Sequence, residues 1–262
     1  MSIVDIGDVS LYYEEYGSGQ PIVFLHGFTL DLRMWRRQLD YFSKNYRAMA
    51  YDSRGHGKSS CPETGYSRRD RVLDLRNFAT KLSLPRFHLV GLSMGGATAL
   101  GYAIDYPETL LSLTLVDTGA GGYAPPSKYR DFKDVARTAG VEEAKRRWIR
   151  TSLFYYANRN KNIGRELAEM MEGHCGRLWL DPKRGKYNDR DDVALSAGVK
   201  LPTLIFAGAK DRHFLPLART LHRNIENSEI DVVPEVGHML NMEAPDRFNR
   251  RLEQFLERVG AG

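Results

Sequence analysis

The most informative stretch of this chain is Leu89-Val90-Gly91-Leu92-Ser93-Met94-Gly95-Gly96. The apolar residues before Gly91 are typical of a short buried strand, and the Ala- and Leu-rich residues 97–106 predict a helix. Ser93 therefore lies at a sharp strand-to-helix turn, and the glycines two positions away on each side give the G-x-S-x-G spacing. Glycine at these positions lets the turn close without collision and exposes the serine hydroxyl. The alternative is a glycine-rich turn whose serine has no catalytic role, because such short motifs also recur by chance.

The composition is that of a globular protein with one sizeable core. The chain has 262 residues, of which 42% are hydrophobic and 27% are charged. Its apolar runs are far shorter than the roughly 20 residues of a membrane span, no leader pattern is visible at the start, and no Lys/Arg run resembles a nucleic-acid-binding arm. Cys61 and Cys175 form no C-x-x-C pair, so neither a disulfide framework nor a zinc site is expected. We therefore predict a cytoplasmic protein with reduced thiols and no membrane or nucleic-acid partner.

Strand and helix patterns alternate along most of the chain. Residues 4–16 alternate and predict an antiparallel hairpin of two strands. Further strand patterns occur at 22–25, 46–51, 86–90, 111–116, 203–207 and 229–233. Helical patterns separate most of these strands, and this alternation predicts an α/β fold with a mostly parallel sheet. From residue 119 to 198 there is no strong strand pattern, and helical patterns occur instead at 129–138, 141–154 and 163–174. We expect residues 1–118 and 199–262 to form the core domain, with 119–198 inserted after the sixth strand.

The loops after the predicted strands carry residues suited to nucleophilic catalysis. A serine hydroxyl needs a histidine to accept its proton and a carboxylate to orient that histidine. His238 is the best candidate base, because it lies in a Gly-His loop between the last strand and the last helix. Asp211 follows a buried strand and is the favoured acid, while Asp117 also ends a strand and stays open as an alternative. His26 and His56 also lie in glycine loops near strand ends, where we expect structural roles. The remaining histidines have no comparable position: His88, His174, His213 and His222.

Five motifs together resemble the α/β-hydrolase fold superfamily. They are His26-Gly27-Phe28, Asp52-Ser53-Arg54-Gly55-His56-Gly57-Lys58-Ser59, the stretch around Ser93, Gly208-Ala209-Lys210-Asp211, and Gly237-His238 followed by Glu243-Ala244-Pro245. The chain is similar in particular to small capped enzymes such as carboxylesterases, 3-oxoadipate enol-lactonases and cofactor-free haloperoxidases or perhydrolases. The resemblance implies an eight-stranded, mostly parallel sheet flanked by helices, with residues 119–198 as a helical cap. It also implies Ser93 as nucleophile, Asp211 as acid, His238 as base, and the backbone N–H groups of Phe28 and Met94 as the oxyanion hole.

The function implied by this resemblance is hydrolysis of carboxylic esters or lactones of small molecules through an acyl-enzyme, without a metal or organic cofactor. Two alternatives stay open. One is carbon–carbon bond hydrolysis or perhydrolysis on the same triad, and the other is a small-molecule receptor that retains the triad. A monomer and a homo-oligomer are equally open.

The predicted cap should supply the substrate pocket. Its large aromatic residues are candidates to line that pocket, unless they form the cap's own core: Trp148, Phe154, Tyr155, Tyr156 and Trp179. Residues 119–198 carry 16 Lys and Arg against 11 Asp and Glu, and so account for the whole formal net charge of +5. This excess would steer an anionic substrate toward the site.

Overall fold

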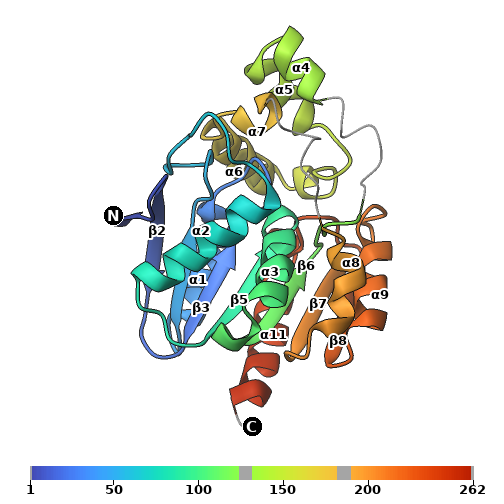
Figure 1. Cartoon of the computed structure of the whole chain (residues 1–262). Coiled ribbons are helices and arrows are strands. Elements are labelled where there is room, and N and C mark those ends of the chain that lie inside the picture. The colour runs from blue at the N-terminus through green and yellow to red at the C-terminus, as the bar shows by residue number, and fades with distance from the viewer. Residues whose placement is uncertain (1, 124–131, 182–189, 261–262) are drawn as a thin grey trace.

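Eight strands form one sheet in the computed structural model, which describes residues 2–123, 132–181 and 190–260 (Figure 1). The strands lie in the order β1-β2-β4-β3-β5-β6-β7-β8. β1 pairs antiparallel with β2, and β2 with β4, while all other neighbours are parallel. The predicted eight-stranded, mostly parallel sheet is therefore confirmed. The strand bounds are β1 Ser2–Asp5, β2 Ser10–Tyr16, β3 Pro21–Leu25, β4 Arg47–Tyr51, β5 Phe87–Leu92, β6 Leu110–Val116, β7 Thr203–Gly208 and β8 Ser228–Val233.

Helices cover both faces of this sheet (Figure 1). On one face α1 (Arg36–Phe42) packs against α11 (Pro245–Gly260), and on the other α2 (Arg68–Lys81) packs against α3 (Met94–Asp105), with α9 (Leu215–Asn224) over β7 and β8. Because both faces are covered, β3, β5 and β7 are buried along their whole length. Among the described helices, none combines the length and the hydropathy of a membrane span.

The described residues between β6 and β7 are largely helical, as predicted. Its helices are α4 (Phe132–Thr138), α5 (Val141–Trp148), α6 (Lys161–Glu172), α7 (Arg177–Leu180) and α8 (Asp192–Leu195). Helices α4 to α7 lie beyond the carboxyl ends of the parallel strands, whereas α8 packs beside α3 and α9 (Figure 1). The start of the first predicted helix falls in residues 124–131, outside the described residues. Helix α5 ends at Trp148, earlier than the predicted 141–154. The carbonyl of Ile149, directly after the helix, accepts a hydrogen bond from the side-chain amide of Asn158 at 2.9 Å.

A disulfide joins Cys61 to Cys175, with 6.5 Å between their Cα atoms. Cys61 lies in the loop after β4 and Cys175 lies between α6 and α7, where its N–H donates to the Gly55 carbonyl at 3.1 Å. The prediction of reduced thiols and no disulfide was wrong. The two cysteines are 114 residues apart in sequence, and only the packing of the inserted segment onto this loop brings them together.

Removal of this cross-link should destabilise the protein. It closes a loop of more than 100 residues, and loss of such a constraint raises the entropy of the unfolded chain. We expect Cys61→Ser/Cys175→Ser to lower the free energy of unfolding by about 2–4 kcal/mol, measured by chemical denaturation. Dithiothreitol should destabilise the wild type to the same extent and leave the double variant unchanged. A wild type that is indifferent to reductant would contradict the cross-link.

Candidate active site

Ser93 occupies the strained turn that the sequence predicts between β5 and α3. Its backbone has φ of 55° and ψ of −110°, a conformation that residues other than glycine rarely adopt. Its N–H donates to the Val116 carbonyl at 3.0 Å, which fixes the turn to the neighbouring strand. A side chain at Gly91 would collide with the backbone of Gly95, and one at Gly95 would collide with the end of β3. Both glycines are therefore needed for the tight turn that presents the serine.

The structure brings Ser93, His238 and Asp211 together in one hydrogen-bonded chain. The Nε2 atom of His238 lies 3.0 Å from the Ser93 hydroxyl oxygen, and its Nδ1 atom lies 2.6 Å from Oδ2 of Asp211. The other oxygen of Asp211 accepts the backbone N–H groups of His213 and Phe214 at 3.2 and 3.3 Å. Phe214 also stacks on the His238 ring, with centroids 4.8 Å apart. The imidazole is thereby held edge-on to both partners, the arrangement needed for proton transfer from a serine.

Asp117, the alternative acid, is also close to His238 but has a different environment. The ligand atoms of Asp117, Asp211 and His238 lie within 4.8 Å of one another. The Asp117 side chain is fully buried and accepts the N–H of Gly208 at 2.7 Å, whereas the histidine bonds to Asp211. Burial, together with the nearby Asp211 carboxylate, raises the pKa of the Asp117 carboxyl well above its ordinary value. These surroundings disfavour the charged form of Asp117, which makes it less suited than Asp211 to stabilise an imidazolium by its charge.

The backbone N–H groups of Phe28 and Met94 lie in the loop after β3 and at the first residue of α3. Met94 therefore presents its amide at the positive end of a twelve-residue helix, next to the Ser93 hydroxyl. The loop of Phe28 is fixed by Thr29, which has φ of 66° and donates its hydroxyl to the Phe28 carbonyl at 2.6 Å. The indole of Trp148 in turn donates to the Thr29 hydroxyl at 2.9 Å. The inserted segment thus holds the loop that carries the predicted oxyanion donor.

Glu243 clamps the loop that carries His238, a role that the motif did not reveal at the sequence level. Its two carboxylate oxygens accept the N–H groups of Gly237 at 2.7 Å and Met239 at 3.0 Å, one on each side of the histidine. Burial raises the pKa of the Glu243 carboxyl, and these two amides oppose the rise. The carboxylate therefore fixes the backbone on both sides of the candidate base.

Glu243→Gln should lower kcat about tenfold with little change in KM. The amide side chain offers one acceptor oxygen where the carboxylate offers two, so one loop N–H loses its partner, at a cost of about 1–3 kcal/mol. Steady-state kinetics on any ester that the wild type hydrolyses provide the measurement. Glu235→Gln is the matched control, because Glu235 lies in the same loop but is 79% exposed. An unchanged kcat in Glu243→Gln would show that the clamp does not position His238.

His26 and His56, both fully buried, serve the backbone of the loops in which they lie. The two nitrogens of His26 bond to the Gly27 carbonyl and the Ser53 N–H, each at 2.8 Å. His56 bonds through Nδ1 to the Arg54 carbonyl at 2.9 Å and lies against the ring of His174. Burial lowers the pKa of His26, and burial with the neighbouring rings of His174 and His26 lowers that of His56 further. Both imidazoles are therefore neutral, as expected of structural histidines.

A cavity of about 270 Å³ lies beside Ser93. Its described lining comprises Phe28, Arg68, Arg71, Ser93, Met94, Ala97, Gly119, Ala120, Gly121, Tyr123, Trp148, Leu153 and Phe214. The pocket therefore joins the Ser93 turn, the Phe28 loop, α2 and the inserted segment.

Of the five aromatic residues predicted to line the pocket, Trp148 alone is among these lining residues. Trp179 and Phe154 are buried with Trp148 in an aromatic cluster, Tyr155 is 60% exposed, and Tyr156 packs on Gly237. Phe154 and Trp179 therefore follow the alternative prediction, in which the aromatic residues form the inserted segment's own core. No local sequence signal marks the other lining residues, because they come from four separate segments that meet only in the folded chain: Arg68, Arg71, Tyr123, Leu153 and Phe214.

Known proteins match this chain over most of its length. The model of the alpha/beta hydrolase family matches residues 22–251. A protein of Synechocystis sp., provisionally named a non-heme chloroperoxidase, is 31% identical over 270 residues and covers 95% of each chain. The 3-oxoadipate enol-lactonase 2 of Acinetobacter baylyi is 26% identical, over 96% of this chain and 94% of its own.

A solved structure gives the same result in three dimensions. The thermophilic esterase of Thermogutta terrifontis superposes with a TM-score of 0.85 at 26% identity, over 96% of this chain and 94% of that one. The family model covers far more than half of the chain. Relatives that are named for different reactions match at least 95% of it. The chain is therefore a member of the alpha/beta hydrolase family.

Proposed function

We propose that this protein is a serine hydrolase that cleaves carboxylic esters or lactones of small molecules. The observation that carries the proposal is the hydrogen-bonded chain from the Ser93 hydroxyl through His238 to Asp211, with distances of 3.0 and 2.6 Å. A relative named as an enol-lactonase and a structural neighbour described as an esterase support the same reaction class.

The reaction proceeds by two acyl transfers. Ser93 Oγ attacks the carbonyl carbon while its proton passes to Nε2 of His238, and the tetrahedral oxyanion is held by the N–H groups of Phe28 and Met94. Collapse breaks the bond to the alkoxide, which takes the proton from His238 and leaves as the alcohol. Water then attacks the acyl-enzyme, gives its proton to His238, and releases the carboxylic acid as Ser93 recovers its hydroxyl. Asp211 stabilises the imidazolium in both steps, and residues 119–198 act as the cap that walls the site.

A second candidate is perhydrolysis, in which hydrogen peroxide replaces water in the second step and a peroxy acid is released. The 31% identical relative that bears a chloroperoxidase name favours it. The triad and oxyanion donors would be the same, because both reactions share the acyl-enzyme.

The cytoplasmic location expected from the sequence stays a prediction. The observation against it is the Cys61–Cys175 disulfide, because the cytosol usually keeps such thiols reduced.

A substrate panel tests the proposed function. Purified protein is assayed on p-nitrophenyl esters of increasing chain length, on lactones and on a β-diketone, with and without hydrogen peroxide. We expect ester or lactone turnover, with the longest acyl chains disfavoured by a cavity of about 270 Å³. Turnover of the β-diketone alone would favour carbon–carbon hydrolysis, and peroxy-acid release would favour perhydrolysis. Tight ligand binding without turnover would instead favour a receptor.

A further inference from the structure

Two arginines of α2 line the cavity beside the candidate nucleophile. Arg68 and Arg71 are the charged groups among the described lining residues, and the rest of that lining is apolar, backbone or hydroxyl. They are three positions apart, so they project from the same face of the helix. A small apolar cavity with positive charge on one wall is suited to a ligand that carries one negative group.

Arg68 is buried, yet its donors are only partly used. Its side chain is 8% exposed and forms a 2.6 Å ion pair with Asp192, which is itself fully buried. The contact is an ion pair rather than an aligned hydrogen bond, and Nη2 of Arg68 donates to the Arg190 carbonyl at 3.4 Å. Within the described residues, the buried Nε of Arg68 has no hydrogen-bond partner. A buried donor without an acceptor is costly, so a ligand that supplies one gains affinity.

Gly121 lies against the same edge of the Arg68 guanidinium. A Cβ atom added at Gly121 would lie 3.1 Å from Nε and 3.2 Å from Nη2 of Arg68. Gly121 is one of the residues that line the cavity. The absence of a side chain at Gly121 therefore lets its backbone approach this edge of the guanidinium beside the pocket.

Arg71 is held one helical turn from the oxyanion donor. Its Nε donates to the Thr98 hydroxyl at 3.2 Å, and Thr98 donates in turn to the Met94 carbonyl at 3.1 Å. Its Nη1 donates to the carbonyl of Tyr66 at 2.9 Å. These two acceptors, a hydroxyl and a carbonyl, orient the guanidinium. The Arg71 guanidinium thus lies in the same cavity as Ser93 and the Met94 N–H, to one side of the position that the scissile carbonyl would occupy.

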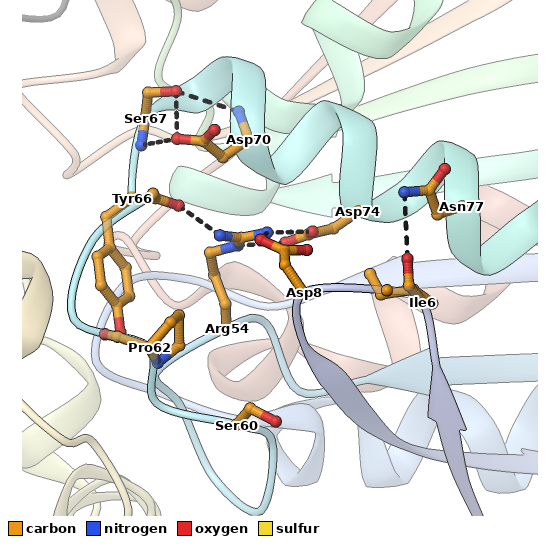
Figure 2. A network of polar contacts seen from close by, with 12 residues as sticks. Ile6, Asp8, Arg54, Ser60, Pro62, Tyr66, Ser67, Asp70, Asp74 and Asn77 are labelled. Atoms are coloured by element: carbon orange, nitrogen blue, oxygen red, sulfur yellow. Dashed lines mark hydrogen bonds and ion pairs between the residues drawn. The ribbon is translucent and has the colours of Figure 1, made fainter.

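The start of α2 is fixed by contacts that do not involve a ligand (Figure 2). Ser67 and Asp70 form a capping box, with the Ser67 N–H donating to Asp70 at 2.8 Å and the Asp70 N–H to Ser67 at 3.1 Å. Arg54 reaches across from the loop after β4 and forms a buried ion pair with Asp74 of the same helix at 2.5 Å. The two cavity arginines are therefore presented on a preorganised helix end.

We propose that Arg68 and Arg71 bind a carboxylate of the substrate, so that the natural substrate is a short ester or lactone that bears a free carboxylate on its acyl part. The inference rests on the proposed function, because it uses Ser93 as the point of acyl attack. The planar guanidinium matches a carboxylate with paired hydrogen bonds, and such charge-assisted bonds are among the strongest in proteins. The scissile carbonyl then lies at Ser93, and the small cavity limits the chain between the two groups.

A matched pair of substrates tests the proposal. One is p-nitrophenyl hydrogen adipate, and the other is the ester in which the free carboxylate is replaced by a primary amide of the same shape. The measured quantity is the ratio of kcat/KM for the anionic ester to kcat/KM for the neutral one, after subtraction of uncatalysed hydrolysis. We expect a ratio of about 10 or more in the wild type. We expect Arg71→Gln to lower it about 10- to 100-fold, the loss of one charge-assisted contact.

Two further variants separate binding from folding. Arg68→Lys keeps a cation beside the buried Asp192 but loses the planar fork, so the ratio should fall while the melting temperature changes little. Arg69→Gln is the matched control, because Arg69 is exposed on the same helix, and its ratio should equal that of the wild type. A wild-type ratio near 1, or a ratio unmoved in Arg71→Gln, would overturn the proposal.

The design distinguishes failure of this inference from failure of the proposed function. Ser93-dependent turnover of both esters at equal efficiency would leave the hydrolase assignment intact and refute the carboxylate site. Where neither ester is hydrolysed, calorimetric titration with adipate decides. Binding to the wild type that is lost in Arg71→Gln supports the site, and no binding to the wild type refutes it.

Discussion

Ser93→Ala is expected to lower kcat for any ester substrate by about five to six orders of magnitude, since removal of a serine nucleophile disables the triad as a unit. The hydroxyl lies 3.0 Å from Nε2 of His238, and no other atom at this position can form the acyl bond. Stopped assays with long incubation provide the measurement. Folding should be little affected, because the Ser93 side chain makes no helix-capping bond.

Covalent labelling provides the control for this variant. A p-nitrophenyl phosphonate should modify wild-type Ser93 and add one phosphonyl group to the peptide that contains it, detected by mass spectrometry. The label should be absent from Ser93→Ala and much slower to form in His238→Ala. Activity in Ser93→Ala comparable to the wild type, or a label on another residue, would exclude Ser93 as the nucleophile.

Asp211→Asn should lower kcat about 10⁴-fold, the typical effect of replacing the acid of a serine triad by its amide. The carboxylate accepts the Nδ1 proton of His238 at 2.6 Å and stabilises the imidazolium. An amide at this position carries no charge and can donate its own N–H to Nδ1, which favours the wrong tautomer of the imidazole. KM should change less than kcat, because Asp211 is 4% exposed and is not among the cavity-lining residues.

Asp117→Asn is the matched comparison, with an expected loss of less than about tenfold. Burial and the nearby Asp211 carboxylate raise the pKa of Asp117 and disfavour its charged form. An asparagine has nearly the same shape and can still accept the Gly208 N–H. Both variants should be compared by kcat and by thermal denaturation. If Asp117→Asn were the damaging change and Asp211→Asn the mild one, the roles of the two acids would have to be exchanged.

The proposed triad could be predicted from the sequence because each of its residues follows a local signal. Ser93 is marked by its flanking glycines, Asp211 by a buried strand and Gly208, and His238 by its place between the last strand and the last helix. Strand ends of a parallel sheet converge at one edge, so local signals of this kind predict proximity without coordinates. The choice between Asp211 and Asp117 was harder, since both follow strands, and their hydrogen bonds and burial distinguish them.

The residues that line the cavity beside Ser93 could not be predicted from local signals in the same way. Its aromatic candidates were chosen for residue type, yet Trp179 and Phe154 pack into the inserted segment's own core. Arg68 and Arg71 looked like ordinary charges at the start of an amphipathic helix. Their burial depends on α3, on Gly121 and on Asp192, which lie up to 124 positions further along the chain.

Local residue patterns were therefore sufficient to predict the mostly parallel sheet, the turn at Ser93 and the candidate base, and to favour Asp211 over Asp117 as the acid. The Cys61–Cys175 disulfide, the Glu243 clamp and the arginine wall of the cavity came from folding alone. The physical reason is the range of the interactions. Turn strain and hydrophobic periodicity act over a few residues and leave a mark in the sequence. Contacts between the loop after β4, α2 and the segment between β6 and β7 join residues about 100 positions apart, and no local pattern encodes which of them will meet.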